Sequence, residues 1–199
     1  MNASKARFCL AAVAAVVLAG CAKGPNPWSP VSYPDELGRY QSDPAHLPAG
    51  WQKFYVEGQE TDSFFFRNQP LDASIIVTFT CGKYQDIPLD LLADHIMFPL
   101  GRSAAVISRG YVPDGRVDVY HVRAKGKVEY DEPKPDQTRG PEATMLMDYY
   151  VVGESHCVVD VVYLAPPKNF ERGLPDFHAA LGDFGIPLAP DGQDEVTRG

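Results

Sequence analysis

The sequence is poor in positive charge and has no hydrophobic run long enough to cross a membrane. Its 18 Lys and Arg stand against 26 Asp and Glu, giving a formal net charge of −8 at pH 7. A chain this acidic is not expected to bind nucleic-acid phosphates or anionic lipid through charge. The apolar run at 8–20 is about 20 Å long as a helix, and the bilayer core is about 30 Å thick. We therefore predict no nucleic-acid partner and no transmembrane helix.

The usual signatures of catalysis are also missing. There is no phosphate-binding Walker loop, no GxGxxG, no CxxC, no HExxH and no EF-hand loop. The segment GESHC at 153–157 begins like a nucleophile elbow, but Cys157 stands where that motif ends in glycine. We expect no catalytic residue, metal or cofactor. A hydrolase or metal-dependent enzyme built on Asp94, His95 or His156 is the alternative.

Three aspartates, Asp86, Asp90 and Asp94, recur every four residues beside His95. Such a stripe has the residue types of a metal site. It is also typical of a solvated helix face whose first acidic residues are favoured by the helix dipole, and we adopt this second interpretation. His121 is expected at the surface or in a hydrogen bond.

The N-terminus is typical of an exported bacterial protein. Lys5 and Arg7 precede the apolar run, which ends in LAGC at 18–21. This ending resembles the bacterial lipobox, in which Leu and two small residues precede a cysteine. The resemblance implies cleavage after residue 20, a diacylglyceryl group on the Cys21 thiol, and acylation of the new amino terminus by a fatty acid such as palmitate. An ordinary secretory signal with a cysteine nearby is the alternative.

Acyl chains would anchor the mature protein without help from charge. Several chains exceed the two signals that stable membrane anchoring requires. Ala22 follows Cys21, and no aspartate stands there to resemble an inner-membrane retention signal. We therefore expect the periplasmic side of the outer membrane. Loss of 1–20 removes two positive charges and no negative one, which takes the formal charge from −8 to −10.

The chain has four cysteines, and we expect two of them to be removed or modified. Cys9 leaves with the leader and Cys21 carries the lipid. Cys81 and Cys157 then remain together in an oxidising compartment, where they can form one intramolecular disulfide. Two buried free thiols, or a catalytic thiol, are the alternatives.

Hydrophobic periodicity divides the rest of the chain. Six prolines in 22–50 predict an extended tether, parts of which can dock on the domain. A helix is expected to begin near Pro88, and another after Pro166 that Pro175 splits into two pieces. Alternating or β-branched runs predict the strands 52–57, 63–68, 73–81, 105–111, 116–127, 142–152 and 156–164. The hairpin between the last two is expected to turn at Gly153 and Glu154.

This order of elements predicts the α+β class, an antiparallel sheet with packed helices. We expect a signal peptide at 1–20, the lipidated cysteine and tether at 21–50, a single domain at 51–186 and a loose tail at 187–199.

The segment CVVDVVYLAPP at 157–167, followed by Phe170 and Phe177, resembles the Mog1/PsbP-like sandwich of small Gram-negative lipoproteins. The position of Cys81 just after a strand adds to the likeness, which covers about 50–186. The resemblance implies a non-catalytic binding or assembly module and supplies no site residues. We therefore expect an anchored protein that binds or positions an envelope component, with another protein as its partner. A carrier of an apolar ligand, such as lipid held between sheet and helices, is a further alternative.

Overall fold

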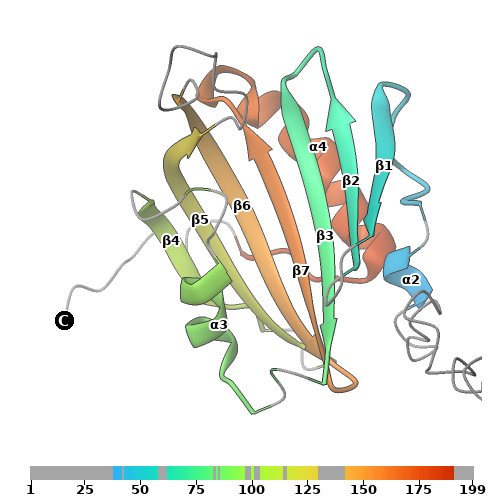
Figure 1. Ribbon diagram of the computed structural model, residues 1–199, viewed down its shortest axis with the longest axis vertical. Coiled ribbons are helices and arrows are strands. Elements are labelled where there is room, and N and C mark those ends of the chain that lie inside the picture. Colours follow the sequence, from blue (N-terminus) through green and yellow to red (C-terminus); the bar gives the residue numbers. More distant parts are fainter. Residues whose placement is uncertain are drawn as a thin grey trace, which may run out of the picture. The chain divides into compact units, whose positions relative to one another are not determined.

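The computed structural model describes residues 38–41, 43–57, 62–82, 84, 86–96, 100, 104–113, 116–129 and 142–190. These residues form a seven-stranded antiparallel sheet with helices packed on it, the α+β class that the sequence predicts (Figure 1). The strands are β1 (Trp51–Glu57), β2 (Asp62–Asn68), β3 (Ala73–Cys81), β4 (Ala105–Tyr111), β5 (Asp118–Glu129), β6 (Glu142–Glu154) and β7 (Cys157–Ala165). The helices are α2 (Gly38–Gln41), α3 (Leu89–Ile96) and α4 (Pro167–Phe184).

The sheet consists of two runs of hairpins joined along one seam. Its strand order is β1-β2-β3-β7-β6-β5-β4, so β1 to β3 pair in chain order and β4 to β7 do the same. The seam pairs β3 with β7, from Ser74 opposite Leu164 to Cys81 opposite Cys157. A disulfide of 2.00 Å joins these two cysteines across the end of the seam. The predicted bridge is therefore present, and it ties the two runs together.

Side chains alternate along each strand, so the sheet has two faces that pack separately. On one, which we call the α3 face, α3 packs against β5 and β6; on the other, the α4 face, α4 packs against β3, β6 and β7 (Figure 1). β7 is central, and all nine of its residues are buried. Covering both faces explains why its sequence is a nearly continuous apolar run instead of an alternating one.

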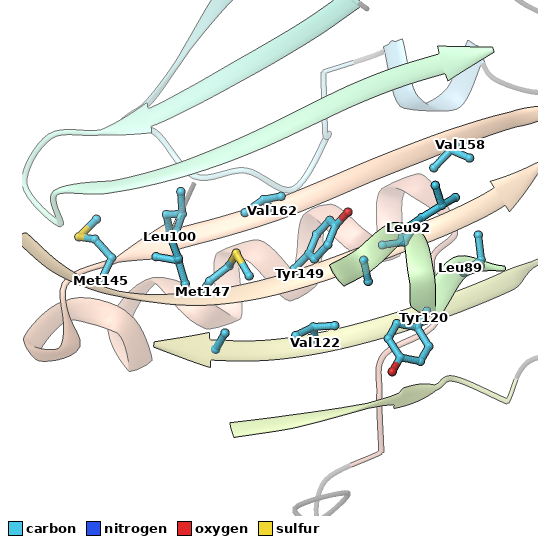
Figure 2. Close-up of a cluster of buried hydrophobic side chains, with 14 residues drawn as sticks. Leu89, Leu92, Leu100, Tyr120, Val122, Met145, Met147, Tyr149, Val158 and Val162 are labelled. Carbon is cyan, nitrogen blue, oxygen red and sulfur yellow. The ribbon is translucent and has the colours of Figure 1, made fainter. Parts of the chain in front are cut away.

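The α3 face carries an apolar cluster that α3 closes from above (Figure 2). The helix contributes three residues at helical spacing, as the sequence predicts. The strands beneath contribute methionines, valines and two tyrosines, and full burial of each large apolar side chain stabilises the fold by roughly 1.5–3 kcal/mol. The cluster contains Leu89, Leu92, Ala93, Leu100, Tyr120, Val122, Ala124, Met145, Met147, Tyr149, Val151, Val158, Val162 and Leu164.

The α4 face is covered by a longer helix that starts after Pro166 and ends at Gly185, which is left-handed with φ 70°. Pro175 lies inside this helix, so the predicted split is wrong. Pro175 and Glu171, whose carbonyl loses its helical hydrogen bond, both face solvent, and water can replace that bond. The buried stripe is Phe170, Leu174, Phe177, Ala180, Leu181 and Phe184.

The last hairpin turns two residues later than expected. Gly153 and Glu154 continue β6, and Ser155 and His156 form the turn with φ of 48° and 64°. Two positive φ values in a two-residue connection are typical of a type I′ turn. Gly153 lies close to α3 instead, because a Cβ there would lie 3.4 Å from Leu89 Cδ2, in van der Waals contact.

Segments on both sides of 51–186 contact the sheet and α4. On the N-terminal side lies α2, at Gly38–Gln41. Tyr40 of α2 is only 1% exposed, and its ring packs 6.0 Å from Phe79 and 5.9 Å from Phe184. After α4, the Ala189 backbone N–H donates to the Tyr150 hydroxyl at 3.3 Å. Parts of 38–50 and of 187–190 therefore pack on the domain, and docking of parts of the tether is what the sequence allows.

Candidate functional site

Two adjoining cavities open at one end of the sheet. One, of about 580 Å³, lies between the segment joining β4 to β5 and the β6–β7 turn. The other, of about 390 Å³, lies between the same turn and the segment leading into α3. Five residues line both, so we treat them as one site and call it the end groove. The shared residues are Tyr111, Asp118, Gly153, Glu154 and Ser155.

Tyr111 is the aromatic wall of the end groove. It ends β4 and is 52% exposed. Its ring meets Tyr120 edge to face at 4.9 Å, and its hydroxyl donates to Asp90 Oδ1 of α3 at 3.3 Å. Burial, and then the negative charge of Asp90, raises the pKa of Tyr111. The phenol therefore stays neutral and the ring is held in one orientation.

Asp118 supplies a carboxylate at the centre of the groove. It begins β5, opposite Gly153 of β6, and it is exposed. Among the described residues, its carboxylate has no hydrogen-bond or ion-pair partner. Because an exposed charge costs little without a partner, Asp118 is free to receive one from outside.

The floor of the groove is a turn held on several sides. The Gly82 backbone N–H donates to the His156 carbonyl at 3.0 Å, and Cys157 is fixed by the disulfide. The Tyr40 hydroxyl donates to Glu154 Oε2 at 2.8 Å, and Arg39 forms an ion pair with the same carboxylate. Left-handed backbone at non-glycine residues costs about 1–2 kcal/mol each. These contacts offset that cost and give the groove a rigid floor.

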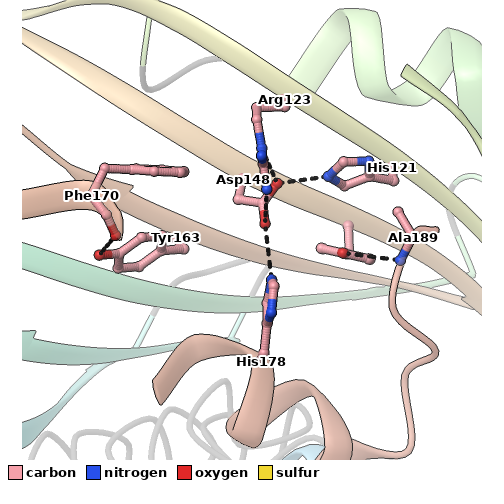
Figure 3. A network of polar contacts seen from close by, with 8 residues as sticks. His121, Arg123, Asp148, Tyr163, Phe170, His178 and Ala189 are labelled. Atoms are coloured by element: carbon pink, nitrogen blue, oxygen red, sulfur yellow. Dashed lines mark hydrogen bonds and ion pairs between the residues drawn. The ribbon is translucent and has the colours of Figure 1, made fainter. Parts of the chain in front are cut away.

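A second polar cluster lies on the α4 face, around the fully buried Asp148 (Figure 3). His121 Nε2 lies 2.6 Å from Asp148 Oδ1, and Arg123 Nε lies 3.3 Å from the same oxygen. From α4, His178 Nε2 lies 3.7 Å from Oδ2. Burial opposes ionisation of Asp148, but the interactions with His121, His178 and Arg123 outweigh it and hold its pKa well below the usual range.

This cluster is built for stability. Both carboxylate oxygens already face cationic or hydrogen-bonding groups, and Asp148 lines neither cavity of the end groove. The cluster ties α4 to the sheet, because His178 belongs to the helix and its partners belong to β5 and β6. His121 thus takes the hydrogen-bonded role that the sequence predicts for it.

A third group of polar side chains, a pair, lies on the α3 face. Tyr149 O–H donates to Asp160 Oδ1 at 2.5 Å, and Asp160 is only 4% exposed. Burial raises the pKa of Asp160 to about 6, although the hydrogen bond from Tyr149 works in the other direction. No cation approaches this carboxyl within the part of the chain that the structure describes.

The residues that the sequence singled out are dispersed. Asp94 forms a surface ion pair with Arg109 at 3.3 Å, and His95 is exposed on the same helix. His156 lines the end groove, but its neighbour Cys157 is bridged and holds no thiol. Cys21 lies outside the described residues. Across those residues, no group of three His, Cys, Asp or Glu side chains is placed to bind a metal.

Sequence reasoning missed both buried aspartates. Asp160 is the one charged residue of CVVDVVYLA, and Asp148 interrupts MLMDYYVV. A lone carboxylate in an apolar strand must find a partner or change its pKa, and that signal was present. The role of Tyr111 and Asp118 depends on elements distant in sequence and had no local signal.

Comparisons with known proteins leave the function open. No model of a known protein family matches the chain, and no curated protein matches it. A Pseudomonas aeruginosa protein of unknown function is similar at a TM-score of 0.45 and 10% identity, over 71% of this chain and 99% of that one. A Bacteroides thetaiotaomicron VPI-5482 structure follows at a TM-score of 0.38 and 15% identity, over 67% of this chain and 41% of that one. None of the described helices has the length and apolar character needed to cross a bilayer.

Proposed function

We propose that the chain is a lipoprotein held on the periplasmic side of the outer membrane by acyl chains on Cys21. The LAGC ending of the leader supports this anchor. The bridge between Cys81 and Cys157 fits an oxidising compartment. The Mog1/PsbP-like form of the fold is part of the same proposal, supported by the helices on both faces and the apolar strand at the centre.

The folded domain is a non-catalytic module that binds a protein of the cell envelope through the end groove. The observation that carries this proposal is the pairing of a half-exposed Tyr111 with Asp118, which has no hydrogen-bond or ion-pair partner among the described residues, over a rigid floor. Half-exposed aromatics beside available polar groups favour recognition. The enzyme alternative has less support, because the Cys157 thiol is consumed and Asp94 is paired away from the groove.

The apolar carrier also has less support. Such a protein needs an enclosed apolar cavity between sheet and helices. The end groove opens to solvent at the end of the sheet, and charged residues such as Asp118 and Arg116 line it. On the α3 face, the space beneath α3 is filled by the apolar cluster.

Replacing Cys21 tests the anchor. In the native host, Cys21→Ser should move the protein from the membrane fraction to the soluble periplasm and abolish incorporation of labelled palmitate, because the modified thiol is lost. Cys9→Ser is the matched control, since it changes a cysteine of the leader that carries no lipid. A Cys21→Ser product that stays in the membrane pellet after a high-salt wash would overturn the anchor.

Site-specific crosslinking tests the binding role. A photoreactive amino acid at Pro113, which lines the groove, should give a discrete adduct with an envelope protein in the native host. The same amino acid at Leu188, which is 46% exposed and outside the groove, should give none. Equal adducts at both positions, or none at Pro113, would contradict the proposal.

A further inference from the structure

The end groove concentrates negative charge around one aromatic ring. Asp118 lines both cavities, and Asp90 accepts the Tyr111 hydroxyl hydrogen. After burial, the charges of Asp90 and Asp118 both contribute to the raised pKa of Tyr111, so both carboxylates act on this ring. A carboxylate pair beside an aromatic ring attracts a cation through charge and through the ring quadrupole.

Apolar surface flanks this centre. Ile87 is 41% exposed and lines the smaller cavity together with Pro88. Pro113 lines the larger cavity together with Tyr111. The methylene stem of a long cationic side chain packs on such surface while its head reaches the polar groups. The chemistry of the lining therefore suits a side chain that is apolar along its length and charged at its tip.

Among the described residues, the cations nearest in sequence to this centre have other partners. Arg109 on β4 pairs with Asp94 at 3.3 Å and does not line the groove. Arg116 lines the larger cavity but is already engaged in an interaction of its own. With a net charge of −8 on the whole chain, long-range attraction also favours a positively charged partner.

We propose that the end groove binds an arginine or lysine side chain from a basic segment of the partner protein, with its charged head between Asp118 and the Tyr111 ring. The stem lies along Ile87 and Pro88, which line the smaller cavity together with Tyr111 and Asp118. This inference rests on the proposed binding function and specifies the chemistry of the partner. Because one exposed carboxylate carries much of the attraction, binding weakens as salt is added.

Calorimetric titration with acetyl-triarginine amide tests the inference on the full chain, purified from its host in neutral detergent. The peptide should bind more weakly at 500 mM than at 50 mM salt, and the uncharged tricitrulline peptide should not bind. Asp118→Asn and Tyr111→Leu should each weaken binding by about two- to fivefold, from the lost ion pair and cation–π contact. Tyr111→Phe, which keeps the ring, should retain most of the affinity.

Glu171→Gln is the matched control, because it removes an exposed carboxylate from α4, outside the groove. Its affinity should equal that of the native chain, and circular dichroism should show every variant folded. Equal weakening by Glu171→Gln and Asp118→Asn, or equal binding of triarginine and tricitrulline, would overturn the inference.

A glycan is the competing ligand of an aromatic, polar groove. Binding of tri-N-acetylglucosamine that is lost in Tyr111→Leu and insensitive to salt, with no triarginine binding, would assign the groove to sugars and overturn the inference. If triarginine fails while the Pro113 crosslink still forms in the host, the binding function stands and only the cationic chemistry is wrong. If the crosslink also fails, the binding function falls with it.

Discussion

Both faces of the sheet are buried, but different elements cover them. The α4 face has a long helix, a buried ionic cluster and the disulfide at its edge. The α3 face has a short helix closed over an apolar cluster. Each face also buries one aspartate, Asp148 on the α4 face and Asp160 on the α3 face, and the two belong to the paired strands β6 and β7.

These aspartates show that partners, and not burial alone, decide how a buried carboxyl behaves. Asp148 is surrounded by His121, Arg123 and His178, which hold its pKa below the usual range against the effect of burial. Asp160 has the Tyr149 hydroxyl, and burial prevails, raising its pKa to about 6. The carboxylate on the α4 face therefore stays ionised in mild acid, whereas the one on the α3 face takes up a proton near pH 6.

The largest change expected is loss of the disulfide at the edge of the α4 face. The bridge spans 76 residues, and the chain-entropy model gives about 4–5 kcal/mol of stability for such a loop. Cys81→Ser with Cys157→Ser should lower the urea midpoint accordingly and make it insensitive to reductant. A native chain whose midpoint is unchanged by reductant would show that the seam holds without the bridge.

Breaking the ionic cluster should cost nearly as much. Asp148→Asn leaves Arg123 without its counter-charge in the buried cluster and should lower the free energy of unfolding by about 3–5 kcal/mol. Urea unfolding at pH 7 measures the loss. His178→Gln is the milder comparison, because His178 is partly exposed and 3.7 Å from the carboxylate. Equal, small losses for both variants would mean that the cluster contributes little.

The stability contributed by Asp160 on the α3 face should change with pH in the opposite direction to that contributed by Asp148. Its folded-state pKa of about 6 exceeds the ordinary value of 3.8, so the native state holds the proton more tightly and its contribution to stability falls as pH rises from about 4 to 6. Asp160→Asn removes this slope. The stability of the variant relative to the native chain should rise by up to about 3 kcal/mol between these limits.

Two further variants test the direction in which stability changes with pH. Tyr149→Phe removes the hydrogen bond that favours ionised Asp160, so the falling limb should move to higher pH. The native chain should lose stability below about pH 4, where unfolded aspartates protonate. Asp148→Asn should not show this loss. A flat difference between Asp160→Asn and the native chain from pH 4 to 7 would contradict the raised pKa.

The smallest expected effect lies at the turn between the two central strands. His156 has φ 64°, a conformation that costs glycine nothing. His156→Gly should raise the free energy of unfolding by about 0.5–1 kcal/mol, measured by urea unfolding. Lys125→Gly, at an exposed position within β5, should lower it by a similar amount. Losses in both variants would show that the turn carries no backbone strain.

Strand positions were predictable because local pattern decides them. The β-branched run at 73–81 and the alternating segment at 105–111 match β3 and β4 residue for residue. Errors arose where tertiary contacts override local preference. Gly153 marks a turn by composition but packs against Leu89, and Pro175 remains helical because it faces solvent.

The candidate site was less accessible to sequence reasoning. The end groove brings together the end of β4, the start of β5 and the β6–β7 turn, and nothing local to Tyr111 or Asp118 indicates that they meet. The disulfide partners were predictable by elimination among four cysteines. The docking of Tyr40 was not, because one aromatic residue in a proline-rich stretch does not reveal where its ring will pack.

The seam between β3 and β7 has a consequence for how quickly the molecule assembles. Each run of hairpins can form from neighbouring segments, but the seam needs residues 76 positions apart to meet. Closing so long a loop is slow, so we expect it to limit the folding rate, and an oxidised chain should refold faster than a reduced one. The turn that forms the floor of the end groove is attached to β7 and hydrogen-bonded to Gly82, so the end groove should be completed last.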